Sequence, residues 1–177
     1  MAKRIAFIRR LETMNEAADR TLQVAEELER RGKLFFESFA AVCRHSRISA
    51  LAASLANAEQ RHISIFKQMR EALPLDRQLT GEELAEASRV LRNAIIPDPA
   101  AVRCAVLDSD FSAVLEMAVT MKTRKVACYA DLAARLEGPY SAALALLIKE
   151  EKEHIRMLTV HRNRFFPQEG KAAPRAA

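Results

Sequence analysis

AEQRHISIF (residues 58–66) and EEKEHIRML (residues 150–158) are the two stretches that decide the fold of this chain. Each contains Glu-x-x-His, and each lies inside a long segment with no Gly or Pro nearby. Because residues three apart face the same side of a helix, one helix can present a carboxylate and an imidazole to a single ion. The pairs Glu59/His62 and Glu151/His154 therefore predict a metal site between two helices.

These two stretches belong to an internal repeat. LERRGKLFFESFAA (28–41) aligns with MKTRKVACYADLAA (121–134) at nearly the same offset as the two Glu-x-x-His segments. Each half of the chain therefore predicts one helical hairpin. Two hairpins joined by a long crossover predict an all-α fold, a four-helix bundle.

Composition also favours helix throughout. Apolar residues make up 50% of the 177 residues, but only 4 residues are Gly and 6 are Pro, so few positions break a helix. The apolar residues recur every three or four positions, which is typical of helices that face water on one side. Capping and turn residues predict four long helices, at about 15–43, 46–72, 110–136 and 140–166.

Residues 73–109 form the predicted crossover between the hairpins. Thr80-Gly-Glu-Glu is typical of a capping box that starts a shorter helix, and the Pro-Asp-Pro segment at 97–99 ends that helix. We expect residues 1–166 to form one domain, and residues 167–177 to be a disordered tail.

Several classes of protein find no support in the sequence. The N-terminal apolar run, Ile5 to Ile8, is far shorter than a signal or membrane segment, so we expect a cytoplasmic protein. The net charge of +5 comes from basic residues interleaved with acidic ones, so we do not expect nucleic-acid binding. The 3 cysteines have no Cys-x-x-Cys spacing and indicate buried thiols rather than a Cys-ligated metal module.

The motif residues resemble the rubrerythrin-like branch of the ferritin-like superfamily, over about residues 21–166. The first-helix pattern of that family, a Glu followed by Gly and an aromatic pair, is matched by Glu29, Gly32 and Phe35-Phe36. The two Glu-x-x-His pairs match its second and fourth helices. The resemblance implies five metal ligands, namely Glu29, Glu59, His62, Glu151 and His154.

The sixth ligand that the resemblance implies is missing. The internal repeat pairs Glu29 with Lys122, and the place one turn further, where the family often carries a second Glu, holds Lys125. No carboxylate lies between Glu116 and Asp131 to replace them. Three carboxylates and one protonated Lys122 leave a net charge of minus two, which one divalent ion would neutralise. We expect one metal, or no metal with Lys122 and water satisfying the carboxylates.

Iron is the metal that the resemblance implies, although carboxylate with imidazole also suits manganese or zinc. Rubrerythrin-like proteins use two irons to reduce peroxide or oxygen, and a rubredoxin module often supplies the electrons. This chain has no Cys-rich rubredoxin segment, so an active oxidoreductase would need an external electron donor. The resemblance also implies a homodimer.

Other readings of the same residues stay open. His62 and His154 could be ordinary bundle histidines, hydrogen-bonded to a carbonyl or to a neighbouring Glu. The site could also be a Lys122-centred salt-bridge network in a non-enzymatic scaffold or partner-binding bundle. A hydroxylase or oxidase acting on an organic substrate would need an open pocket beside the metal.

The side chains around the ligands are assigned by helical periodicity. Phe36 and Tyr129 lie seven residues past Glu29 and Lys122, so we expect them to pack beneath the site, with Tyr129 able to hydrogen-bond a carboxylate. The other Glu residues that flank the motifs are expected on solvated helix faces, Glu26 and Glu150 among them.

Overall fold

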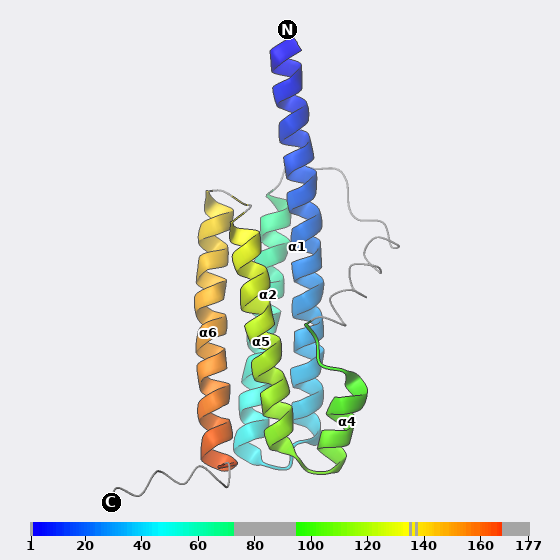
Figure 1. The fold of residues 1–177 in the computed structure, drawn as a ribbon, viewed down its shortest axis with the longest axis vertical. Coiled ribbons are helices and arrows are strands. Elements are labelled where there is room, and N and C mark those ends of the chain that lie inside the picture. Colours follow the sequence, from blue (N-terminus) through cyan, green and yellow to red (C-terminus); the bar gives the residue numbers. More distant parts are fainter. Residues whose placement is uncertain (1, 73–94, 135, 137, 168–177) are drawn as a thin grey trace, which may run out of the picture.

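The computed structural model describes residues 2–72, 95–134, 136 and 138–167, with backbone alone for 2–18, 20, 21 and 139. Five helices make up these residues and no strand occurs among them, which confirms the prediction of an all-α fold (Figure 1). They are α1 (Ala2–Val42), α2 (Ser46–Glu71), α4 (Pro99–Leu107), α5 (Phe111–Ala133) and α6 (Pro139–Phe165).

The four long helices form two antiparallel hairpins. Among the described helices, α1 packs most extensively on α2, and α5 packs most extensively on α6, as the internal repeat predicts. Figure 1 shows these four helices side by side, with the short helix α4 next to α1 and α5. The bundle therefore brings one face of each long helix to a shared centre.

The first helix is longer than predicted. Its backbone is helical from Ala2, rather than from Asn15, and its first turns extend past the neighbouring helices (Figure 1). The added residues, AKRIAFIRRLETM, are mostly good helix formers and include neither Gly nor Pro. An Asn is only weakly unfavourable inside a helix, so Asn15 does not start a new one.

Helix α4 was not predicted, because the Pro-Asp-Pro segment was interpreted only as a break. The Asp98 side chain accepts a hydrogen bond from the Ala100 N–H at 3.0 Å, and Pro99 occupies the first turn. An Asp N-cap followed by Pro is a start signal for a helix. The shorter helix predicted from Thr80 falls mainly within 73–94, outside the described residues, as does the predicted tail after Pro167.

The second hairpin begins and turns where the sequence predicts. Asp110 accepts a hydrogen bond from the Ala113 N–H at 2.9 Å and caps α5. Gly138 precedes α6 with a φ of 61°, in the left-handed region that favours glycine, and Pro139 then occupies the first turn of the helix.

The core of the bundle is mostly apolar, with a group of buried charged side chains in the middle, and Asp19, Gln23 and Glu26 of α1 are buried as well. Large core side chains such as Phe36, Phe39 and Phe66 are fully or almost fully buried. Cys43 is buried as expected, whereas Cys104 is exposed, because α4 lies on the outside of the bundle. Within the described ranges, no helix is both long and apolar enough to cross a membrane.

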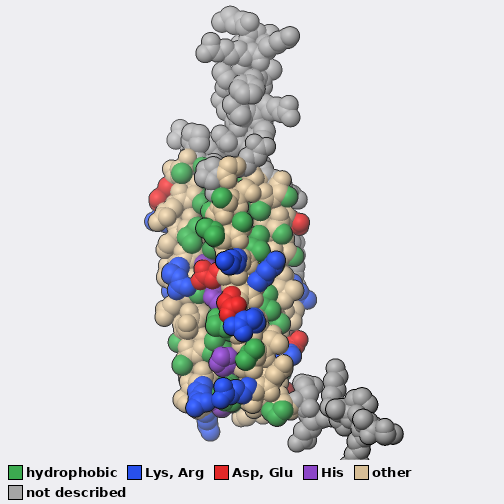
Figure 2. All heavy atoms as spheres, turned by 90° about the vertical axis from the view of Figure 1, so that its left-hand side faces the viewer, with side chains coloured by type: hydrophobic (Ala, Val, Ile, Leu, Met, Phe, Trp, Pro, Cys, Tyr) green, Lys and Arg blue, Asp and Glu red, His purple; other side chains and the backbone are tan. Residues whose placement is uncertain are grey.

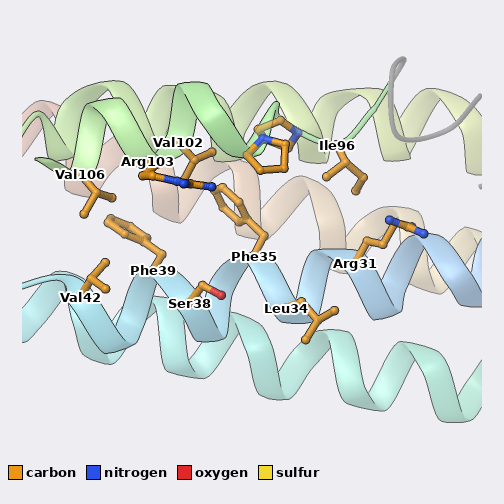
Figure 3. A pocket seen from close by; sticks show the side chains of 12 residues that line it. Arg31, Leu34, Phe35, Ser38, Phe39, Val42, Ile96, Val102, Arg103 and Val106 are labelled. Carbon is orange, nitrogen blue, oxygen red and sulfur yellow. The ribbon is translucent and has the colours of Figure 1, made fainter. Parts of the chain in front are cut away.

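Two surface features lie outside the bundle centre. Figure 2 shows the side of the molecule that carries α6, where acidic, basic and hydrophobic side chains are mixed rather than sorted into one charged patch. Between α1 and α4 lies a mainly apolar cavity of about 530 Å³, with Phe35 and Phe39 on one wall and Val102 and Val106 on the other (Figure 3).

Candidate metal centre

Six ionisable side chains meet in the middle of the bundle, and all six have an exposed fraction of 0%. Helix α1 contributes one of them, α2 contributes two, α5 contributes two and α6 contributes one. We call this group the buried cluster; it consists of Glu29, Glu59, His62, Lys122, Lys125 and Glu151. Each member lies on the core-facing side of its helix.

Four members of the buried cluster could hold a metal ion. One ligand atom from each of Glu29, Glu59, His62 and Glu151 lies within 4.8 Å of the others. His62 Nδ1 lies 3.2 Å from Glu151 Oε1 and 3.6 Å from Glu29 Oε1, and it is buried without a hydrogen-bond partner. Neighbouring ligand atoms that are each about 2 Å from one ion are separated by roughly 3 Å, so this spacing fits a single cation. Three carboxylates and an imidazole suit iron, manganese or zinc.

Lys122 lies between two of these carboxylates. Its Nζ is 2.8 Å from Glu59 Oε1 and 2.7 Å from Glu151 Oε2, and it donates a hydrogen bond to Glu151 Oε1 at 2.8 Å. The same ammonium group is 5.5 Å from the centre of the Phe36 ring, close enough for a cation–π contact. Lys122 therefore occupies the side of the site on which the family resemblance implies a sixth ligand.

Lys125 contacts the ligands as directly as Lys122 does. Its Nζ is 2.6 Å from Glu29 Oε2 and 2.5 Å from Glu59 Oε2, so it bridges α1 and α2. Gly32 makes room for it, because a Cβ at Gly32 would lie 2.8 Å from both Lys125 Nζ and Glu59 Oε1. Every carboxylate of the buried cluster thus has an ammonium partner.

Tyr129 and Phe36 pack against the buried cluster, and Tyr129 adds one polar contact. Its hydroxyl donates a hydrogen bond to Glu29 Oε1, and its ring packs on Phe66 with 5.3 Å between ring centres. Burial, together with the negative charge of Glu29, raises the pKa of Tyr129 well above its usual value. The hydroxyl therefore keeps its proton and remains a donor to Glu29.

The mutual contacts set the charge of each group. Burial alone would raise the pKa of Glu29 and of Glu151, but the ammonium groups of Lys125 and Lys122 hold both pKa values below the usual range. Burial and the charge of Lys125 lower the pKa of Lys122 to about 8. Burial would lower the pKa of His62, but its contacts with Glu151 and Glu29 outweigh this and raise it to about 9.

The charges of the buried cluster balance one another when His62 is protonated. Three ionised carboxylates and two ammonium groups sum to minus one, and the protonated imidazole of His62, whose pKa is raised to about 9, brings the sum to zero. The sequence-based sum of minus two left out two groups: Lys125, which lies within reach of two carboxylates, and His62, whose pKa is raised to about 9.

His154 lies at the edge of the buried cluster. It is 6% exposed, and its Nδ1 is 3.7 Å from Glu151 Oε2, the oxygen that also contacts Lys122. Its ring lies beside that of His62, with 6.1 Å between ring centres, but it is not among the four residues whose ligand atoms converge. Of the five ligands that the resemblance implies, His154 is the one that the geometry sets apart.

Two glutamates were wrongly expected to face solvent only. Glu150 reaches both imidazoles, with Oε2 at 3.4 Å from His62 Nε2 and Oε1 at 3.8 Å from His154 Nε2. Glu26 is 6% exposed and pairs with Arg70 of α2 at 2.9 Å. A signal for Glu150 was present, since it precedes His154 by four residues and so shares its helix face. Glu26 had no such signal, because its partner lies on another helix.

The cavity between α1 and α4 is lined by none of the buried cluster residues. It therefore does not provide the pocket beside the metal that an organic substrate would need.

Comparison of the chain with protein-family models, with curated proteins and with solved structures found no match. The all-helical bundle with buried Glu and His residues is compatible with a ferritin-like fold, and the resemblance to rubrerythrins rests on the motif residues.

Proposed function

We propose that this protein binds one divalent transition-metal ion, iron in the first instance, through Glu29, Glu59, His62 and Glu151. The observation that carries the proposal is His62 Nδ1, a fully buried nitrogen without a hydrogen bond that faces carboxylate oxygens at 3.2 and 3.6 Å. A buried polar atom without a partner is costly, and a cation that displaces the proton of His62 would satisfy it.

Two lysines limit the proposed site to one ion. Lys122 and Lys125 each place an ammonium group within 2.8 Å of two carboxylates. A second cation on that side would meet two positive charges at short range, which is strongly unfavourable in a water-excluded site. We therefore propose a one-metal centre, in contrast to the two irons of rubrerythrins.

The chemistry that we propose is reduction of peroxide or oxygen, or iron binding without turnover. Iron held at this place would supply a redox-active Lewis acid in a site from which the protein excludes water. Tyr129 orients Glu29 through its hydrogen bond, and Lys125 holds Glu29 and Glu59 in place. Lys122 holds a proton at Nζ, and its pKa of about 8 makes that proton available near neutral pH.

Partners follow from the same proposal. An active protein would take electrons from a separate donor, because no Cys-rich electron-transfer segment occurs in the sequence. We also propose a homodimer, on the family resemblance alone.

The experiment that tests the proposal is a metal count on two matched histidine variants. Wild-type protein should hold about one iron per chain after anaerobic ferrous loading and removal of loosely bound metal. His62→Gln should abolish this binding, whereas His154→Gln should retain it, because His154 lies outside the converging ligands. Loss of binding in both variants, or two irons in the wild type, would contradict a one-metal site.

A second candidate is a metal-free scaffold, and the neutral charge sum favours it. The buried cluster balances its own charges when His62 is protonated, so the fold does not require a cation for neutrality. This candidate predicts no bound iron, manganese or zinc in the wild type, with a helical circular dichroism spectrum that loading leaves unchanged. Stoichiometric binding that depends on His62 would exclude it.

A further inference from the structure

The cavity between α1 and α4 has the size and the lining of a small-molecule site. Its volume of about 530 Å³ lies within the roughly 300–1,000 Å³ that such sites usually have. Phe35 and Phe39 of α1 face Val102 and Val106 of α4 across it (Figure 3). Walls of this kind bind an apolar chain through the hydrophobic effect.

The charged groups that line the cavity are all cationic. Arg31 of α1 and Arg103 of α4 line it, and none of the described residues that line it is acidic. Arg31 pairs with Glu27 of its own helix at 2.9 Å, so its charge is already balanced. Arg103 is exposed and forms no ion pair within the described part of the chain. Arg103 is therefore the cation that an anionic ligand would meet here.

Exposed apolar surface gathers at the same place. Leu34 and Val42, which line the cavity, are 61% and 48% exposed, and Leu107 at the end of α4 is 76% exposed. A ligand with an apolar chain would remove part of this surface from water. A second copy of the chain is a poor occupant, because a twofold contact would bring the arginines of both copies together without a lining carboxylate.

We propose that this cavity binds an amphipathic anion of the fatty-acid class, with its alkyl chain between the two phenylalanines of α1 and the two valines of α4 and its carboxylate on Arg103. A guanidinium group presents its N–H donors in a planar fork that matches a carboxylate. The proposal is independent of the proposed metal function, because no residue of the buried cluster lines the cavity.

Calorimetric titration of the full chain with decanoate tests the proposal. We expect saturable binding of one decanoate per chain, and an affinity that rises about fourfold per methylene from hexanoate to decanoate, because each buried methylene adds a similar apolar area. Decanol has the same chain without the charge and should bind about tenfold more weakly. No saturable binding of decanoate, or equal affinities for decanoate and decanol, would overturn the proposal.

Variants of Arg103 test the place of the carboxylate. Arg103→Gln should weaken decanoate binding by about tenfold and leave decanol binding unchanged, whereas Arg103→Lys should retain most of the affinity. Arg156→Gln removes an exposed guanidinium of α6 that pairs with Glu153, and as the control it should change neither affinity. Equal decanoate affinity in Arg103→Gln and the wild type would contradict the assignment.

A second pair of variants tests the place of the chain. Val102→Phe fills part of the cavity and should weaken both decanoate and decanol, whereas Ala100→Phe adds the same ring at an exposed position of α4 outside the lining and should weaken neither. Circular dichroism shows whether each variant keeps its helices. Unchanged binding by a folded Val102→Phe would overturn the proposed place of the chain.

Two further measurements distinguish the other occupants. Binding to phosphatidylglycerol vesicles without saturable binding of decanoate would mean that this face contacts a membrane surface. A dimer in analytical ultracentrifugation that is lost in Val102→Phe would mean that a second copy covers the cavity. Either result would overturn the proposal of a free amphipathic anion.

Discussion

The two halves of the internal repeat meet at the buried cluster but contribute opposite charges to it. The first half supplies two carboxylates and an imidazole from α1 and α2, whereas the second supplies two ammonium groups and one carboxylate from α5 and α6. At equivalent positions of the aligned repeat, Glu29 stands opposite Lys122, and Gly32 stands opposite Lys125. The halves therefore differ both in charge and in size.

This difference shows how a duplicated fold can diverge without leaving an unbalanced core. A Cβ at Gly32 would lie 2.8 Å from Lys125 Nζ, so the smallest side chain of one half provides space for a long side chain of the other. The ammonium groups of the second half then balance the carboxylates of the first. Lys125 is accommodated because the equivalent position of the first half, Gly32, leaves room for it, and because Glu29 and Glu59 balance its charge.

Removing one ammonium group should break this complementarity most strongly. Lys125→Met removes the ammonium group whose Nζ lies 2.6 Å from Glu29 Oε2 and 2.5 Å from Glu59 Oε2. Breaking a buried pair in this way costs about 3–5 kcal/mol of unfolding free energy. Urea denaturation of metal-free protein measures the loss. Lys152→Met on the exposed face of α6 is the control and should change stability by less than about 0.5 kcal/mol.

Filling the space at Gly32 should have the next largest effect. An alanine in a helix is normally more stable than glycine by about 1 kcal/mol, but Gly32→Ala places a methyl group against Lys125 and Glu59 and should destabilise by about 1–3 kcal/mol. A loss of unfolding free energy in Gly32→Ala would therefore indicate a steric clash, whereas a gain would reflect only the higher helix propensity of alanine. In a double-mutant cycle with Lys125→Met, the penalty for Gly32→Ala should shrink, because Met carries no charge to displace. Additive effects would show that the two positions are independent.

The pH dependence of stability should separate the contributions of the two halves. The pKa of His62 is raised from 6.5 to about 9, so its stabilisation is complete below pH 6.5 and is lost as the pH rises through 9. The pKa of Lys122 is lowered from 10.5 to about 8, so this group makes stability rise with pH only above about 8. Between pH 6.5 and 8 the unfolding free energy of the metal-free protein should fall, by up to about 2 kcal/mol.

His62→Gln should flatten this fall, and His161→Gln, a partly exposed control, should retain it. The midpoint of urea unfolding at several pH values measures both variants. A wild-type stability that stays constant from pH 6.5 to 8 would mean that His62 is not protonated in the folded state.

The smallest effect is expected where the two halves meet at the surface. Arg61 of the first half pairs with Glu150 of the second at 2.7 Å, but the Arg61 side chain is 60% exposed. Exposed ion pairs contribute roughly 0–1 kcal/mol, so Arg61→Ala should lower stability by less than about 1 kcal/mol. A loss above about 1 kcal/mol in thermal unfolding would contradict this and show that the pair contributes more than an exposed ion pair does.

Much of the fold and part of the candidate site could be predicted from the sequence, because both depend on helical periodicity. The three-residue spacing placed Glu59 and His62 on the same buried face of α2, and the internal repeat placed Lys122 on the buried face of α5. The first feature depends on residue spacing within one helix, and the second depends on the alignment of two equivalent helices. The long helices followed from the same periodicity and from few breaking residues.

The contacts that the sequence could not predict are those between different helices. The reach of Lys125 to both Glu29 and Glu59 depends on the separation of α1, α2 and α5, which no residue spacing encodes. Glu26 was expected to face solvent because apolar periodicity assigns charged side chains to the exposed face of a helix. In the structure, Glu26 is buried and pairs with Arg70 of α2. The aligned repeat does pair Gly32 with Lys125. Without the distance between their helices, however, the sequence could not show that Gly32 leaves room for the Lys125 side chain.

A bundle centre made of ionised side chains also affects how stability changes with temperature. Hydration of charged groups becomes less favourable on heating, so the desolvation penalty of the buried cluster falls as temperature rises. Exposure of polar surface on unfolding also lowers the heat-capacity change, which flattens the stability curve. The two lysines that weaken the case for a two-metal site therefore help the fold more in warm conditions than in cold ones.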